Sequence, residues 1–313
     1  MEQEYAGKSF RHKRAVFTVL AVLLLVLGLL PALFPSGYSS WWQAVYSSFG
    51  LSDFSSIAKD YPMSLHVLNV GKADSILVEC KGKYLLVDGG TPDQAETVNR
   101  YLARRGVTAL DYIINTHPDS DHVGGLSGVI EEYKVDHYFM PQLPENLLPS
   151  DSVYTNTIQS LKRKGLSPEY LRGGNTLTLG DVRIEVLAPL SILNSTNENS
   201  IVLMLTYGQT RFLLMGDAEA GEESAILATQ KDLHADVLKV GHHGSKTSST
   251  AAFLAAVKPK YSAVSVADSQ YELPNREVMD RLNRYSATVG RTDVSGTLLY
   301  CSDGTTIIYQ TER

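Results

Sequence analysis

The chain has 313 residues, of which 43% are hydrophobic and 20% are charged, so it can bury a large core and does not have the composition of a disordered chain. Its 34 acidic and 28 basic residues give a formal net charge of −6, which excludes a broad cationic surface for clamping nucleic acid. Two cysteines, Cys80 and Cys301, are too few for a disulfide scaffold, and the sequence leaves open whether they pair.

The first expected element is a transmembrane helix at residues 15–34. This segment carries no charge and is close to the length that about 30 Å of hydrocarbon requires. Basic residues precede it and tryptophans follow it, so residues 1–14 are expected to form a cytoplasmic tail and residues 35–62 a stalk or linker outside the cytoplasm. A cleaved signal peptide is the alternative, but the apolar run is longer than the usual ~7 to 15 residues and no small-x-small cleavage site follows closely. We therefore expect a single-pass protein of the cell membrane.

Residues 63–313 alternate short apolar runs with turn residues, which predicts one domain of strands and helices. Two successive blocks of hairpins, each followed by helices, indicate two mixed sheets packed together with helices outside, a four-layer α/β arrangement. In chain order, strands are expected at 64–70, 75–80, 84–90, 111–116, 137–141, 181–189, 200–208, 211–217, 235–241 and 261–267, helices at 91–105, 123–133, 219–230, 250–257 and 276–285, and a closing hairpin at 297–309.

The loop after the strand at 111–116 has the sequence THPDSDHVGG, which places His117, Asp119, Asp121 and His122 within six positions. A tight loop at the carboxyl end of a buried strand can aim these side chains at one point, where the carboxylates would repel each other without a cation. Imidazole combined with carboxylate suits Zn, Mn or Fe, and added carboxylate favours the harder ions. The four residues are therefore candidate metal ligands.

Two later strand ends carry similar side chains. Asp217 follows a glycine at the end of one strand, where its carboxylate could bridge two metal ions. His242 and His243 follow the next strand, and Ser245, Lys246 and three further hydroxyl residues then stand where a helix is expected to begin. Free backbone N–H groups at such a helix end favour a phosphate or carboxylate ligand. The three clusters together predict one composite site at the strand ends.

On these segments the chain resembles the metallo-β-lactamase superfamily, whose hallmark is an H-x-H/D-x-D-H loop followed by a distant Asp and a distant His. More narrowly, it resembles the hydrolase domain of the ComEC-type competence proteins. The resemblance covers about residues 63–310 and implies a four-layer αββα metallo-β-lactamase sandwich, here preceded by the N-terminal transmembrane helix. The segments that carry it are 66–79, 84–90, 116–126, 199–219, 238–248 and 291–300.

The resemblance also implies a centre for up to two divalent metal ions, Mn or Zn. By position, His117 and Asp119 would face the first metal. Asp121 and His122 would face the second metal, and Asp217 would bridge the two.

Within this resemblance, His242 directly follows a strand and a glycine, so we favour it as the last ligand of the second metal. His243 would then support that ligand or face the substrate. Asp121 and His243 are the expected catalytic residues. The expected substrate-binding residues are Asn199, Ser200, Ser245 and Lys246.

The chain departs from the family pattern in three segments. Members with two full zinc sites commonly have a third His on the first metal, and the matching segment 197–200 has none. The first metal would therefore be held weakly, which favours an exchangeable ion such as Mn. Ala73 stands where relatives typically have glycine, and Leu273 stands where relatives often have the His of Gly-His-Pro. Asp74 and Asp88 are more readily interpreted as carboxylates that hold the metal loop than as ligands.

The predicted reaction is hydrolysis, because bound metal ions can activate water and polarise an electrophile while Asp121 accepts a proton. A phosphodiester is the favoured substrate class, with extracellular DNA first and a cell-envelope phosphodiester, such as a phosphocholine-bearing teichoic acid, as the competitor. A β-lactamase fits less well, since Asp119 and the missing third His depart from the zinc-lactam pattern. The alternative of another class is a non-catalytic, metal-containing module that binds DNA or envelope polymer. No nucleotide cofactor is expected.

Overall fold

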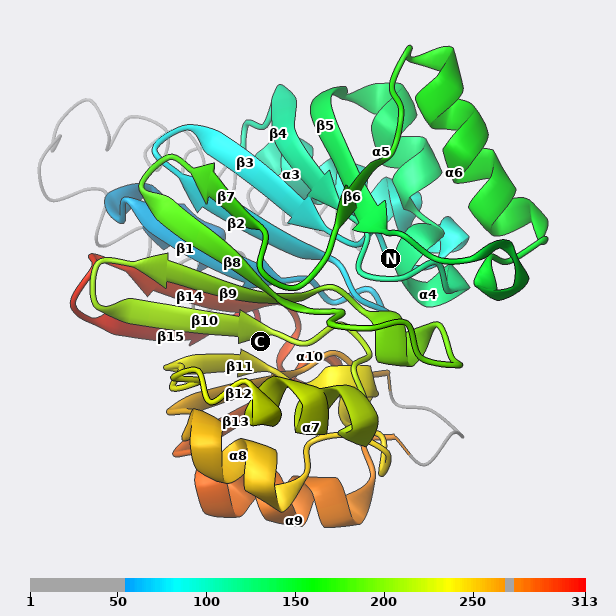
Figure 1. The fold of residues 1–313 in the computed structure, drawn as a ribbon. Helices are drawn as coiled ribbons and strands as arrows, with labels where there is room; N and C mark the ends of the chain where they lie inside the picture. Colours follow the sequence, from blue (N-terminus) through cyan, green and yellow to red (C-terminus); the bar gives the residue numbers. More distant parts are fainter. Residues whose placement is uncertain (1–53, 268–272) are drawn as a thin grey trace, which may run out of the picture. The chain divides into compact units, whose positions relative to one another are not determined.

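A computed structural model describes residues 54–267 and 273–313 (Figure 1). The expected transmembrane helix at 15–34, the tail before it and most of the linker lie outside the described residues. Within the described residues, no helix combines the length and the hydropathy that crossing a bilayer requires. Residues 55–313 form one compact unit.

Two mixed β-sheets form the inner layers of this unit (Figure 1). In the described chain, the larger sheet has eight strands in the order β15-β14-β1-β2-β3-β4-β5-β6, and the smaller has seven in the order β13-β12-β11-β10-β9-β8-β7. The larger sheet comprises β1 (Met63–Val67), β2 (Ile76–Cys80), β3 (Lys83–Val87), β4 (Ala109–Ile114), β5 (Lys134–Pro141), β6 (Glu169–Leu171), β14 (Leu298–Ser302) and β15 (Ile307–Thr311). The smaller comprises β7 (Thr176–Leu179), β8 (Val182–Ala188), β9 (Val202–Tyr207), β10 (Thr210–Leu214), β11 (Val237–Lys239), β12 (Tyr261–Val264) and β13 (Thr288–Arg291).

Helices cover the outer face of each sheet (Figure 1). The larger sheet packs against α3 (Ala95–Arg104), α4 (Ser120–Val123), α5 (Leu126–Glu132) and α6 (Ser152–Arg163), and the smaller against α7 (Ala220–Ala228), α8 (Ala251–Val257) and α9 (Arg276–Tyr285). The short helix α10 (Thr292–Ser295) and the 3-10 turns η1 (Phe54–Asp60), η2 (Pro92–Gln94), η3 (Glu145–Leu147), η4 (Asn197–Asn199) and η5 (Gly241–Gly244) complete the elements of the described residues. The expected four-layer αββα sandwich is confirmed.

Alternation along the strands explains why both faces of each sheet are buried. In β3, Leu85 and Val87 point into the core between the sheets, while Leu86 points into the outer core under the helices. In β8, Val182 and Ile184 face the core between the sheets. Successive strand residues point to opposite faces, so a continuous apolar run fills two cores at once.

Parallel pairing brings the predicted site residues to one edge of each sheet. β4 is parallel to both β3 and β5, and β10 is parallel to β11, so the loops that follow these strands leave at their carboxyl ends. The Ile201 N–H donates to the Thr116 carbonyl oxygen at 2.9 Å, which ties the two edges together. At Gly216, with φ of 52°, a Cβ would lie 3.0 Å from Thr116 side-chain atoms, so only glycine lets the end of β10 approach the end of β4 this closely.

The structure adds elements that we did not predict from the sequence, namely α6, β6, β7 and β13. It also divides the helix expected at 123–133 into α4 and α5. Cys80 and Cys301 are both buried and free. They lie on the two strands that flank β1, opposite Met63 and Ser64, so two strand spacings of about 4.8 Å separate their backbones, which is more than a disulfide can span.

Candidate metal centre

Four imidazoles surround the carboxylate of Asp217, which follows β10. The Nε2 atoms of His122 and His243 lie 3.2 and 3.7 Å from its Oδ1. The Nε2 atoms of His117 and His242 lie 3.9 and 3.8 Å from its Oδ2. The two oxygens of one carboxylate thus face two different pairs of histidines, an arrangement that suits a carboxylate bridging two cations.

The innermost of these atoms have no hydrogen-bond partner among the described residues. They are the Nε2 atoms of His117, His122 and His243 and the Oδ1 atom of Asp217, and all four residues are almost fully buried. Buried polar atoms left without partners cost free energy, and native structures satisfy nearly all of them. A divalent cation would satisfy these nitrogen and oxygen atoms together, and their chemistry is that of the ligands that Zn, Mn and Fe accept. The residues therefore fit a metal centre.

His243 and Asp121 lie together on the Oδ1 side of Asp217. The Nε2 of His243 is 3.6 Å from the Asp121 Oδ2, and Asp121, His122 and His243 offer ligand atoms that all lie within 4.8 Å of one another. The second set of three, His117, His122 and Asp217, meets the same limit.

The paired histidines therefore occupy the reverse of their expected positions, since His243 rather than His242 lies beside Asp121 and His122. Both residues have left-handed backbones, with φ of 46° and 52°, and their Nε2 atoms lie against different oxygens of Asp217. The ring of His243 is fully buried, whereas 22% of the His242 side chain is exposed.

Asp119 lies on the Oδ2 side, with His117. Its Oδ2 is 3.8 Å from the His117 Nε2, and 37% of its side chain is exposed. Asp119 is also the residue that precedes α4, where it makes no capping hydrogen bond with its side chain. Its carboxylate is therefore free to act as a ligand on the open side of the centre.

In His122 and His243, the ring nitrogen that faces away from Asp217, Nδ1, lies next to an oxygen acceptor. Nδ1 of His122 lies 2.8 Å from Asp88 Oδ2, and Nδ1 of His243 lies 2.9 Å from the Ser265 carbonyl oxygen. A proton on Nδ1 leaves the Nε2 lone pair for a metal, which is the common arrangement of metal-bound histidine. Asp88 accordingly orients the loop, as expected, since Thr116 and Asn115 also donate to its carboxylate.

The charged groups inside the centre shift one another's pKa values. Burial disfavours the charged imidazole of His122, but the carboxylates of Asp217 and Asp88 outweigh it and raise the pKa of His122 well above its usual value. Burial likewise opposes the charge on Asp217, while His122 and His243 hold its pKa well below the usual value. The Asp217 carboxylate is therefore ionised.

Two lysines beside the centre were missed from the sequence. Lys72 Nζ donates to Asp121 Oδ2 at 2.9 Å. Lys239 is fully buried, and its Nζ lies 2.7 Å from Asp74 Oδ2, while the Asp74 N–H donates to the Asp121 carbonyl oxygen. The only signal for Lys239 was one lysine inside an apolar strand. Asp74 thus contacts the loop of Asp121 through its backbone N–H, whereas its carboxylate pairs with Lys239 of β11 instead of holding the loop, which differs from the interpretation of the sequence.

Asn199 and Ser200 differ from their expected role as substrate contacts. Both are fully buried. The Asn199 amide is used up by backbone groups of Leu193 and Ser195, which shapes the loop before β9. Ser200 Oγ lies 3.4 Å from His117 Nδ1 and accepts from the Asp217 N–H at 3.1 Å, so it positions two candidate ligands.

The expected anion site before α8 is already occupied by a protein carboxylate. Glu223 accepts from the N–H groups of Ser249 and Thr250, at 2.5 and 2.9 Å. Those are the donors that would have held a phosphate. Of the two substrate-binding residues expected there, Ser245 is half-buried with its hydroxyl 2.9 Å from that of Thr247, and Lys246 is exposed.

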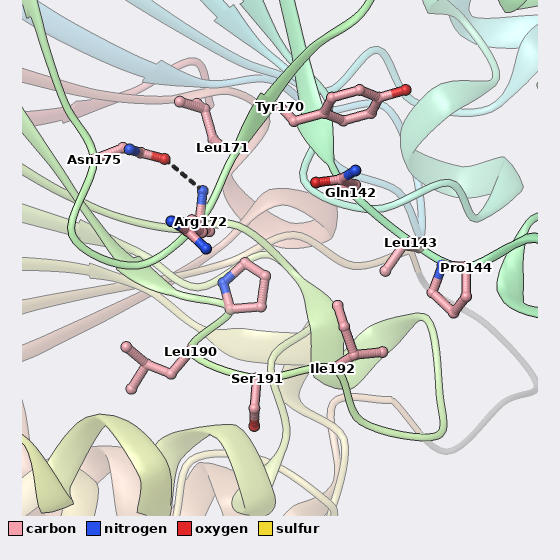
Figure 2. Close-up of a pocket in the computed structure, with 11 residues that line it drawn as sticks. Gln142, Leu143, Pro144, Tyr170, Leu171, Arg172, Asn175, Leu190, Ser191 and Ile192 are labelled. Atoms are coloured by element: carbon pink, nitrogen blue, oxygen red, sulfur yellow. Dashed lines mark hydrogen bonds between the residues drawn. The ribbon is translucent and has the colours of Figure 1, made fainter.

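A cavity of about 780 Å³ opens beside the strand ends (Figure 2). Residues after β5, around β6 and after β8 line it, and Tyr170, Leu190 and Ile192 are 54%, 46% and 49% exposed. Figure 2 shows Arg172 among them, its backbone N–H donating to Asn175 Oδ1 at 2.8 Å. β5 and β6 run parallel to β4, so this cavity lies at the same carboxyl edge of the sheet as His117, which follows β4 two strands away from β6.

A four-layer αββα sandwich with a histidine and aspartate cluster at its strand ends defines a class of metal-binding proteins. The family model of the metallo-beta-lactamase superfamily matches residues 68–267, and the chain belongs to this superfamily.

Its relatives include competence proteins, as the sequence predicted. ComE operon protein 3 of Bacillus subtilis is 30% identical over 254 residues, which are 75% of this chain and 32% of the relative. Competence protein ComA of Neisseria gonorrhoeae is 30% identical over 291 residues, 90% of this chain and 38% of the relative. Recombination protein 2 of Haemophilus influenzae is 31% identical over 237 residues, 73% of this chain and 27% of the relative. The chain thus spans about a third of the length of these relatives.

Solved structures share the fold at low sequence identity. The E377D mutant of the CmlA beta-hydroxylase has a TM-score of 0.53 at 14% identity and covers 88% of this chain and 62% of its own. The metallo-beta-lactamase fold protein YhfI from Bacillus subtilis has a TM-score of 0.50 at 12% identity and covers 75% of this chain and 99% of its own.

Proposed function

We propose that this chain is a metal-dependent phosphodiesterase and that DNA is its favoured substrate. The observation that carries the proposal is the convergence of four histidine Nε2 atoms on the two oxygens of Asp217, with Asp119 and Asp121 on opposite sides. Bound divalent ions would polarise the phosphoryl group and activate a water for attack.

The residues around the centre suit the roles that this reaction requires. Burial raises the pKa of Asp121, but His243, His122 and Lys72 together lower it below its usual value, so the carboxylate stays ionised. An ionised Asp121 can bind a cation and orient the attacking water. The ammonium of Lys72 lies 2.9 Å from Asp121 Oδ2, so it would also lie near a phosphoryl group attacked beside Asp121. There it would neutralise the negative charge that develops on the phosphoryl oxygens.

DNA is favoured over other phosphodiesters on two grounds. Two relatives that match most of this chain are named a recombination protein and a competence protein, and recombination is a reaction of DNA. The cavity at the same edge offers the exposed ring of Tyr170 for a base and the cation of Arg172 for a phosphate. The serine-rich segment before α8 gives no support, since Glu223 occupies its donors.

We further propose that the chain is anchored by residues 15–34 with the compact unit outside the cytoplasm. The support is the uncharged segment with basic residues before it. Protease added to intact cells should then digest residues 63–313, and full protection of that part would contradict the orientation.

The activity is tested with the purified full-length chain, stripped of metal and then supplied with Mn²⁺ or Zn²⁺. Hydrolysis of a chromogenic phosphodiester should depend on the metal and be lost in Asp121→Ala, while Asp280→Ala, an exposed carboxylate on α9, should behave as the wild type. DNA and a phosphocholine-bearing teichoic acid are then compared as substrates, and faster cleavage of the envelope polymer would identify the competing function.

A non-catalytic binding module is the second candidate. Leu273 stands where relatives often have the histidine of Gly-His-Pro. It is partly buried and packs against the core of the smaller sheet, so this position supplies an apolar side chain in place of an imidazole. A folded chain that binds Mn²⁺ and DNA but hydrolyses neither substrate would favour this candidate.

A further inference from the structure

The first metal of the proposed centre lacks a histidine that comparable centres have. The segment 197–200 contains no histidine, and in the structure Asn197 lies there, with its side-chain amide 3.4 Å from the Nε2 of His242. The imidazole of His242 therefore reaches from the opposite loop into the space beside this segment.

His242 has the same relation to Asp217 as His117 has. Their Nε2 atoms lie 3.8 and 3.9 Å from the same oxygen, Oδ2, whereas His122 and His243 lie against Oδ1. The four imidazoles thus form two pairs, one for each oxygen of the bridging carboxylate.

Nδ1 of His242 lies next to a carboxylate that orients the imidazole, as is common for metal-bound histidines. Its Nδ1 lies 2.9 Å from Glu219 Oε1, and the Thr247 hydroxyl donates to the same oxygen at 2.7 Å. His122 with Asp88 and His243 with the Ser265 carbonyl repeat this arrangement. In each case an oxygen accepts the Nδ1 proton, so Nε2, which faces Asp217, is the nitrogen left to bind a metal.

The backbone conformation of η5 orients both His242 and His243. Two successive residues other than glycine have left-handed φ values, a conformation that costs free energy and favours glycine. Orienting His243 alone would not require a side chain at the preceding position. With both present, one loop after β11 sends one imidazole to each side of Asp217.

We propose that His242 is the second imidazole ligand of the first metal, alongside His117, Asp119 and the Oδ2 of Asp217. It replaces the histidine that segment 197–200 lacks. Because the His242 side chain is 22% exposed and that of Asp119 37% exposed, this metal would face solvent more than the second, whose histidines His122 and His243 are fully buried, and it would exchange faster. The proposal rests on the metal centre proposed above, but it does not depend on which bond the centre cleaves.

The test counts metal ions instead of turnover. Full-length wild type, His242→Ala, His243→Ala and the control His234→Ala, an exposed histidine after α7, are stripped and titrated with Mn²⁺. We expect two ions per chain in the wild type and the control, with an electron paramagnetic resonance spectrum broadened by exchange between two bridged Mn²⁺ ions. His242→Ala should retain one tightly bound ion and the hyperfine pattern of isolated Mn²⁺.

A second variant keeps the test independent of folding defects. Glu219→Gln leaves His242 in place but removes the charge that orients it, and loss of such an orienting partner typically weakens metal binding by about 10–100-fold. We expect this loss at the weaker site only. Two ions bound with unchanged affinities in His242→Ala and Glu219→Gln, or a single ion in the wild type, would overturn the proposal. A wild type that binds two exchange-coupled ions without hydrolysing phosphodiesters would overturn the proposed function and leave this assignment intact.

Discussion

Replacing Asp88 by asparagine tests whether the carboxylate behind His122 prepares that histidine as a ligand. Asp88 is 1% exposed, and its Oδ1 accepts from the Thr116 N–H and the Asn115 amide at 2.8 and 3.0 Å. Its Oδ2 accepts from the Thr116 hydroxyl at 2.7 Å and lies 2.8 Å from His122 Nδ1. An asparagine with its oxygen at the Oδ1 position keeps two of these bonds but turns an N–H₂ group toward His122.

The consequence is a change of tautomer at His122. Two donors cannot face each other, so the proton moves from Nδ1 to Nε2, and a protonated Nε2 cannot bind a metal. Loss of an orienting partner of this kind weakens metal binding by about 10–100-fold, which corresponds to about 1.4–2.7 kcal/mol. Loss of the buried charge-assisted bonds should also lower the free energy of unfolding by about 1–3 kcal/mol. The left-handed φ of 59° at Asp88 is no obstacle, because asparagine adopts that region readily.

The assay is calorimetric titration of stripped, full-length Asp88→Asn with Mn²⁺, beside the wild type and Asp280→Asn as an exposed control on α9. Urea unfolding of the same samples separates weaker binding from loss of fold. A folded Asp88→Asn chain that binds both ions within twofold of the wild-type affinity would refute the argument that Asp88 prepares His122.

Three further predictions concern other parts of the unit. Burial, and then the Glu198 carboxylate, raise the pKa of Glu222 from 4.5 to about 10, so the folded chain keeps a proton there that the unfolded chain releases. Stability should therefore fall as pH rises from about 4.5 toward 10, and Glu222→Gln should be more stable than the wild type by about 1–3 kcal/mol in urea unfolding at pH 8 but not at pH 5; an equal effect at both would contradict this. Cys80 and Cys301 should both titrate as free thiols in denaturant without reductant, and a count of zero would show a disulfide. Arg172→Ala should raise the KM for DNA about 3–10-fold and leave hydrolysis of a small chromogenic diester unchanged, whereas equal losses on both substrates would place Arg172 outside a DNA subsite.

Much of the fold could be predicted because its strands are apolar on both faces. Runs such as those of β3 and β10 lie between two cores, so the pattern is strong and its position in the chain is clear. β6 and β7 were missed because they are short and largely exposed. α6 did have a signal, since Asp151 caps it by accepting from the N–H groups of Val153 and Tyr154.

The composite site was predictable in its members but not in its partners. The loop from His117 to His122 concentrates ligands locally, so its chemistry is visible in the sequence. Which of His242 and His243 faces Asp121 depends on two left-handed φ values, which residue identity alone does not determine. Likewise, the serines before α8 suggest an anion site, and only the fold brings the carboxylate of Glu223 to them from 26 residues away.

The candidate ligands of the proposed centre come from both sheets, which explains why neither half of the sequence suffices for the site. The loop after β4 supplies His117, Asp119, Asp121 and His122 from the larger sheet, while the loops after β10 and β11 supply Asp217, His242 and His243 from the smaller. Asp217 lies next to histidines of both groups, so its distances to them depend on how closely the edges of the two sheets approach each other. The close approach at Gly216 keeps those edges together. A side chain there would move Asp217 away from the loop after β4, and the two proposed metal sites should be lost together, because the proposal has them share one carboxylate.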